Sequence, residues 1–120
     1  MSDTESITEK TDDELYEIAK PWWEDLIKYS NNKNYLMFIK NFSRQFRQSA
    51  NEMEIGKQFA RSDLATNLSK KYDVLGTIRR DDYVTVLFRQ YHKKREGEWL
   101  GRLVLGYEDG AVKIFSATLF

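Results

Sequence analysis

Histidine and cysteine, the side chains most readily turned into a base or a nucleophile near neutral pH, are scarce in this sequence. His92 is the only histidine of the 120 residues, and there is no cysteine. An isomerase or cyclase needs a histidine or carboxylate base in an apolar pocket, with a partner that stabilises oxyanion charge. His92 borders the basic run Lys93-Lys94-Arg95, which is typical of a solvent-facing hairpin end. The sequence therefore predicts no catalytic residue, and an enzyme of this kind remains an alternative hypothesis.

The sequence also contains no motif for binding a metal ion or a cofactor. One histidine without cysteine leaves only carboxylate sites for a metal ion. A helix start explains Asp12-Asp13, and a turn explains Asp81-Asp82. The sequence contains no glycine-rich phosphate loop and no nucleophile elbow. We therefore expect no metal and no cofactor.

The charge of the chain is balanced overall but uneven along its length. Residues 1–25 carry nine acidic and two basic side chains, whereas residues 26–120 carry ten acidic and seventeen basic ones. The basic residues Arg79, Arg80 and Lys93 to Arg95, with Tyr83 and Tyr91 nearby, supply the minimum for nucleic-acid binding. Hairpin tips are commonly charged for solubility, so nucleic acid is only the third hypothesis for the partner.

The elements that must position these residues begin with a small folded domain. A composition of 41% hydrophobic and 14% aromatic residues is typical of a globular protein. No apolar run approaches the roughly 20 residues of a spanning helix, and the polar, acidic stretch 1–11 lacks the pattern of a secretory signal. We expect a disordered acidic tail over 1–10, one domain over 11–120, a cytoplasmic location and no membrane contact.

The helical pattern starts at Thr11. Thr11 and Glu14 form a capping box, and the apolar residues that follow at helical spacing predict a helix to Ser30. Pro21 predicts a kink, or two shorter helices meeting there. These apolar residues are Leu15, Ile18, Ala19, Trp22, Trp23, Leu26 and Ile27.

Shorter helices are expected next. The pattern predicts one over 35–42, leaves 43–48 ambiguous, and gives Ser49 and Glu52 as a capping box for a third helix. That helix runs through Met53, Gly56, Phe59 and Ala60, and a further helical turn contains Leu64, Ala65 and Leu68.

The second half of the chain alternates as strands do. The sequence predicts a short strand over 72–79 and three longer ones over 83–92, 99–107 and 111–120, joined by turns into an antiparallel meander. With two-residue turns at Glu96-Gly97 and Asp109-Gly110, Phe88 opposes Leu105 and Leu105 opposes Ile114. The predicted fold class is α+β, with amino-terminal helices on a curved four-stranded sheet.

The alternation sorts the strand residues onto two faces. One face is apolar in its middle and should carry the helices. Its polar end predicts a small-molecule pocket, unless it is simply a sheet end in solvent. The predicted pocket contains Trp22, Trp23, Gln90, His92, Trp99, Ser116, Thr118 and Phe120. The other face mixes aromatic residues with arginine, as interfaces do. The predicted interface contains Tyr83, Arg89, Tyr91, Arg102, Lys113 and Phe115.

A capped first helix with Trp22-Trp23, short helices through Phe38 and Phe59, and a final meander resemble the nuclear-transport-factor-two-like, or cystatin-like, cone fold. The resemblance covers most of residues 11–120, and it is to small bacterial members of unknown function. The early hairpin of that fold is not readable here unless residues 43–48 hide it. The family includes isomerases, cyclases and non-catalytic dimers, so the resemblance selects no single function. The leading hypothesis is a non-catalytic module that acts as a homodimer, either for association with protein or for binding a small apolar ligand.

Overall fold

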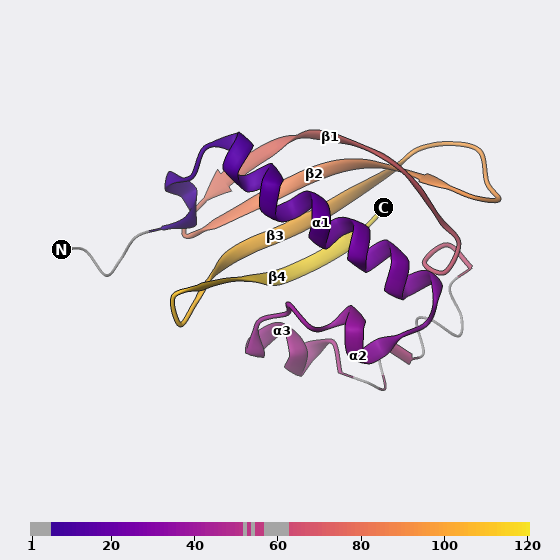
Figure 1. Ribbon diagram of the computed structural model, residues 1–120, viewed down its shortest axis with the longest axis horizontal. Coiled ribbons are helices and arrows are strands. Elements are labelled where there is room, and N and C mark those ends of the chain that lie inside the picture. Colours follow the sequence, from indigo (N-terminus) through magenta and orange to yellow (C-terminus); the bar gives the residue numbers. More distant parts are fainter. Residues whose placement is uncertain (1–5, 52, 54, 57–62) are drawn as a thin grey trace.

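The computed structural model describes residues 6–51, 53, 55–56 and 63–120 of the chain (Figure 1). The expected disorder of residues 1–5 and the expected helical positions of Glu52, Phe59 and Ala60 lie outside the described residues. Helices precede a four-stranded antiparallel sheet, which confirms the predicted α+β class. Figure 1 shows α1 lying diagonally across one face of the sheet, with α2 and α3 beside β4.

The elements follow one another in the order in which the sheet is built. The helices are η1 (Ile7–Glu9), α1 (Asp12–Asn31), α2 (Tyr35–Phe38) and α3 (Arg44–Ser49), and the strands are β1 (Leu68–Arg80), β2 (Tyr83–His92), β3 (Trp99–Glu108) and β4 (Ala111–Leu119). The sheet order is β1-β2-β3-β4, so each strand pairs with its neighbour in sequence. The predicted meander is therefore confirmed.

The predicted disorder of the first ten residues is wrong for residues 6–10. Ser6 caps the short helix η1, and the Ile7 side chain is completely buried in the core. An isolated isoleucine in a polar stretch gives no periodic signal, yet burying it removes a large apolar surface from water. This segment therefore belongs to the domain.

Helix α1 begins where the sequence predicts and is not interrupted at Pro21. The Thr11 side chain accepts a bond from the Glu14 backbone, and the Glu14 side chain accepts one from the Thr11 backbone. The helix then continues through Pro21 to Asn31, so the prediction of two shorter helices is wrong. Pro21 and Glu17 are both exposed. The Glu17 carbonyl, which Pro21 leaves without a helical donor, can therefore bond to water.

The connection between α1 and the sheet differs from its predicted outline. Residues 43–48 form a helix start, because Ser43 caps α3, so this stretch hides no hairpin. Ser49 is the last residue of α3 and bonds back to the Phe46 carbonyl, so it does not cap a following helix. Leu68, predicted as helical, is the first residue of β1. Met53, Ile55 and Gly56 are helical as expected.

The observed sheet register departs from the predicted one in two places. Residues 93–98 form the whole β2–β3 loop, so Leu105 pairs with Val84, four positions before the predicted Phe88. An even shift keeps every side chain on its predicted face. In β4 a bulge leaves Phe115 unpaired, because Leu105 faces Ile114 while Val104 faces Ser116. Beyond that bulge the two faces of β4 are exchanged relative to the prediction.

The core lies between α1 and one face of the sheet. Leu15, Ala19 and Trp23 of α1 pack there, and the strands contribute the alternate residues of β2 and β3. The buried apolar strand residues are Leu68, Val84, Val86, Phe88, Leu103, Leu105 and Ile114. The molecule measures 50 × 29 × 19 Å. A thickness of 19 Å corresponds to one helix layer on one sheet, and no described helix covers the second face of the sheet.

Candidate functional site

Two of the predicted pocket residues form a fixed contact inside the core. The Trp23 indole donates to the Gln90 side-chain oxygen at 2.8 Å, and the Gln90 amide donates to the carbonyls of Ser69 and Tyr91 at 2.7 and 2.8 Å. The Trp23 ring stacks on Phe88, with centroids 4.7 Å apart. Gln90 is completely buried with its polar atoms bonded. It therefore holds the helix to the sheet and has no group left for a ligand.

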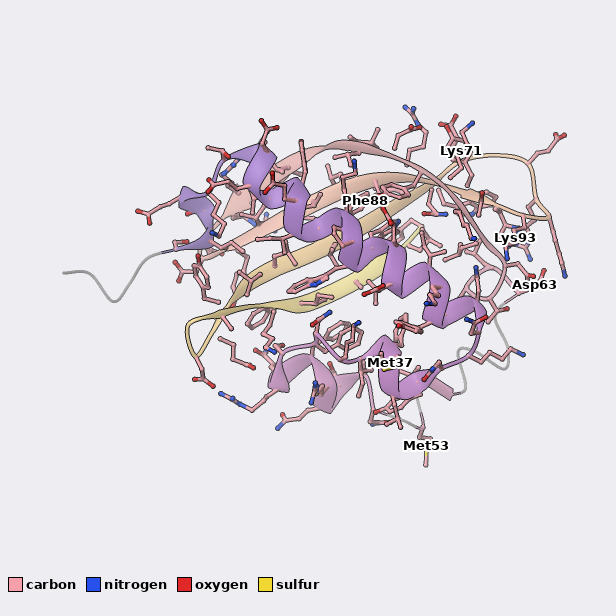
Figure 2. The ribbon with its side chains drawn as sticks, in the orientation of Figure 1. Met37, Met53, Asp63, Lys71, Phe88 and Lys93 are labelled. Atoms are coloured by element: carbon pink, nitrogen blue, oxygen red, sulfur yellow. The ribbon has the colours of Figure 1, made fainter. Side chains whose placement is uncertain are left out.

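His92 stabilises the start of the β2–β3 loop. Its Nδ1 accepts bonds from the backbone amides of Lys94 and Arg95 at 3.0 and 3.1 Å, and its Nε2 lies 3.3 Å from the Asp63 carbonyl. These partners are those of a neutral ring that carries its proton on Nε2. Both nitrogens are occupied by backbone groups, so the ring positions a loop rather than an incoming substrate. Figure 2 shows Asp63 and Lys93 at this same end of the molecule.

The remaining predicted pocket residues are dispersed. Trp99 lies beside the His92 ring, with centroids 5.7 Å apart, and Trp22 is half-buried against the core. Ser116 and Thr118 pair with Val104 and Arg102 on the opposite face of the sheet from Trp23. Phe120 is there too, because the Arg102 guanidinium stacks over its ring at 4.3 Å. The structure therefore does not bring these eight side chains together in one pocket, and the β4 bulge accounts for the displacement of Ser116, Thr118 and Phe120.

An apolar cavity does exist at the end of α1, with mostly different residues. Its volume is about 200 Å³, and Trp23 and Thr118 are the only predicted pocket residues that line it. Ser30, at its edge, donates its hydroxyl hydrogen to the Ala65 carbonyl. The other lining residues are Leu26, Ile27, Phe38, Leu64, Ala65, Leu68, Ala117 and Leu119. Sequence alternation could not assign Ala117 and Leu119 to this side, because the bulge reverses them.

The second face of the sheet, which we call the outer face, gathers the predicted interface residues. The strand pairings align its side chains in four rows that cross the strands. The first row is Arg80, Tyr83, Gly106 and Lys113; the second is Ile78, Thr85, Val104 and Ser116; the third is Gly76, Leu87, Arg102 and Thr118; the fourth is Asp73, Arg89, Leu100 and Phe120. Four large apolar residues are well exposed on this face, namely Ile78, Tyr83, Leu100 and Phe120.

The fourth row of the outer face carries a network of ion pairs and a hydrogen bond. Arg89 lies 3.2 Å from Glu98 and 3.5 Å from Asp73, and the Tyr91 hydroxyl donates to Asp73 at 3.1 Å. The neighbouring Glu98 carboxylate and the contact with Tyr91 raise the pKa of Arg89. Four of the six predicted interface residues, Tyr83, Arg89, Arg102 and Lys113, thus occupy these rows. Tyr91 and Phe115 lie beside them.

An aromatic hollow of about 240 Å³ opens at the first-row end of the outer face. Tyr83 and Phe115 meet edge to face at 5.1 Å, and Phe46 of α3 closes the side. Both rings lie against Gly106, where an added Cβ would come within 3.0 Å of them. The glycine thus lets the two rings settle onto the backbone of β3. The sequence pattern indicates Gly106 only as a bend or bulge, and it gives no signal for Phe46.

A charged groove of about 780 Å³ runs between α1 and β1, on the helix side of the sheet. Lys28, Lys70 and Lys93 line it together with Glu24, whose carboxylate accepts a 2.5 Å bond from the Tyr72 hydroxyl. Burial and this bond raise the pKa of Tyr72. Two acids, Glu24 and Asp25, line the groove with the three lysines, so it shows no single charge preference.

Neither metal binding nor membrane insertion gains support from the described residues. Among them, no three histidine, cysteine or carboxylate side chains converge in the way a metal ion requires. No helix in this part of the chain is long and apolar enough to cross a membrane.

Comparison with known proteins supplies no relative. Neither the protein-family models, nor the curated proteins, nor the solved structures include a match to this chain. The resemblance to the nuclear-transport-factor-two-like fold therefore stays a prediction. The outer face and the apolar cavity are the features of the structure that bear on function.

Proposed function

We propose that this protein is a non-catalytic association module that forms a homodimer through the outer face of its sheet. The observation that carries the proposal is the composition of that uncovered face. Tyr83, Leu87, Val104, Phe115 and Leu100 form an apolar band, and arginines flank it. Interfaces are enriched in aromatic residues and arginine, whereas ordinary solvent-facing strands carry mainly polar residues.

The outer face is large enough for such a contact. Four strands at about 4.8 Å spacing and four rows at about 6.7 Å spacing cover roughly 500 Å² on each partner. Two such faces bury about 1,000 Å², the lower limit for a specific interface. We therefore expect a modest affinity, with dimer and monomer exchanging.

The arrangement of the polar core residues favours association over catalysis. Gln90 and His92, the polar side chains predicted to line a pocket, both have their hydrogen-bonding atoms occupied by Trp23 or by backbone groups. A general base must reach the proton of a bound substrate, either directly or through one water molecule. Using His92 in this way would first require the β2–β3 loop to open.

Native mass spectrometry and light scattering test the homodimer. Val104→Arg places a charge at the centre of the outer face, and Leu36→Arg makes the same kind of change on α2, where the side chain is 76% exposed. We expect a dimer for the wild type and for Leu36→Arg, and a folded monomer for Val104→Arg. A wild type that is monomeric at high micromolar concentration contradicts the proposal, and so does a Val104→Arg variant that dimerises normally.

The apolar cavity supports a second function, binding of a small apolar molecule. Its volume of about 200 Å³ and its apolar lining suit a compact hydrocarbon or aromatic ring. Titration with indole or naphthalene, followed by the NMR shift of the Trp23 indole N–H, tests this. Ala117→Leu should fill the cavity and abolish binding, while Ala111→Leu, at an exposed site, should leave it unchanged. Equal binding by both variants would exclude this cavity as the site.

A further inference from the structure

The two ends of the outer face carry complementary side chains, so the face fits a second copy of itself that is turned end over end. This inference rests on the proposed homodimer. We propose that two copies pack outer face to outer face about a two-fold axis that runs across the strands, level with Leu103. The first row of one copy then lies over the fourth row of the other, and the second row lies over the third. Such an interface is isologous and closed, as a dimer requires.

The aromatic end of each copy is the first element of the match. Gly106 and Leu100 lie three residues to either side of Leu103 on β3, so the rotation exchanges their positions. Phe120 pairs with Leu100 through two 2.9 Å backbone bonds, and its side chain is 62% exposed. By the row order Phe120 comes to lie over the partner's Lys113, while Leu100 lies over Gly106 at the partner's aromatic hollow of about 240 Å³, so the two side chains together cover that end. A well-packed aromatic anchor in a pocket is the usual source of interface affinity.

Charge supplies the second element. Arg80 is the β1 residue of the first row, and Asp73 is the β1 residue of the fourth row. The same rotation places Arg80 of each copy over the partner's Asp73, so two opposite-charge pairs form per dimer. Within one copy the two residues are seven positions apart on a strand, roughly 23 Å, and cannot touch. Opposite charges across an interface fix its register.

The other two-fold overlay of the same faces, with the axis along the strands, is disfavoured. It places β1 over the partner's β4 and each row over itself. Arg80 would then lie over the partner's Lys113, because both residues belong to the first row. This overlay therefore creates two like-charge contacts per dimer. It also places the aromatic hollow over the partner's first row, so Leu100 and Phe120 of the fourth row cannot cover it. Like charges brought together at an interface oppose association.

A charge exchange between the two β1 positions tests the register. Arg80→Asp and Asp73→Arg should each raise the dimer dissociation constant about fivefold or more, because each creates two like-charge contacts between copies, and Asp73→Arg adds one with Arg89 inside each copy. The double variant should return to within about threefold of the wild type. Since the two residues do not meet within one copy, recovery can only come from contact between copies. Phe120→Ala should weaken the dimer about tenfold, and Leu36→Ala, at an exposed site on α2 away from the sheet face, should not.

The outcomes separate this proposal from the one on which it rests. A monomeric wild type would remove both. A wild-type dimer that Val104→Arg disrupts, but in which the charge exchange brings no recovery, would keep the homodimer and refute this register. Tighter dimerisation of Arg80→Asp alone would indicate the other overlay, because the new aspartate would face Lys113.

Discussion

The contact between Trp23 and Gly101 allows a stability prediction with a magnitude. A Cβ added to Gly101 would lie 2.5 Å from two carbons of the Trp23 ring. Carbon atoms in contact prefer about 3.5–4.0 Å, so the indole must move by about 1 Å or more in the Gly101→Ala variant. It cannot move freely, because Phe88 stacks on it and Gln90 accepts its N–H hydrogen.

The cost follows from what the displaced ring loses. Overpacking in a core costs about 1–3 kcal/mol, and leaving Gln90 without its donor costs about 1–3 kcal/mol. Alanine regains roughly 0.5 kcal/mol over glycine in a strand. We expect Gly101→Ala to lower the free energy of unfolding by about 3 kcal/mol, which corresponds to a fall in Tm of roughly 12 °C for a domain of this size.

Urea denaturation followed by circular dichroism measures this change. Gly56→Ala is the matched control, because Gly56 is helical and has no atom within 4 Å of the added Cβ. That variant should be neutral or more stable by up to about 1 kcal/mol. Trp23→Phe in the Gly101→Ala protein should cost less than the sum of the two single changes, because the smaller ring relieves the clash. A loss below about 0.5 kcal/mol for Gly101→Ala would refute the reasoning.

Three further predictions concern α1. Thr11→Ala removes the capping box and should destabilise the protein by about 1 kcal/mol, measured by urea denaturation. Pro21→Ala restores one helical hydrogen bond at an exposed site and should stabilise by about 1–3 kcal/mol, with a higher Tm as the readout. Hydrogen bonds from Thr77 and Arg79 lower the pKa of Asp12 below its ordinary value of 3.8. Its stabilising effect is therefore present above that value and is lost as the pH falls through the lowered pKa. An NMR titration should show this, and Asp12→Asn should flatten the stability curve below about pH 4, whereas an ordinary pKa would show that these hydrogen bonds do not stabilise the carboxylate.

The parts of the fold that the sequence predicts well are those governed by local rules. The capping box at Thr11 and Glu14, and the strands beginning at Tyr83 and Trp99, depend on residues close together in the chain. Two shorter helices meeting at Pro21 are not formed, because the penalty for the proline depends on whether solvent can reach the freed carbonyl. That condition is set by the orientation of the whole helix and is invisible in the local sequence.

The candidate sites were harder to predict, because they depend on register. The even shift caused by the β2–β3 loop left the predicted interface face intact, so Arg89 and Arg102 were placed correctly. The bulge at Phe115 shifts the register by one residue, which is odd. Ser116 and Thr118 therefore lie on the outer face, whereas the sequence predicts them on the face that carries the helices. Neither residue type nor alternation marks that position. The parallel bridge between Phe42 and Ile114, between residues far apart in the chain, lies directly beside it.

The bulge also determines how β4 tolerates changes in length. Removing one residue from the middle of a regular strand turns every later side chain to the opposite face. Phe115 is the extra residue of the bulge, since Ile114 and Ser116 pair with consecutive residues of β3. A deletion of Phe115 would therefore leave Ser116 to Leu119 facing as they do now. Of the positions in this strand, 115 is where evolution or design could shorten the chain without exchanging core and surface.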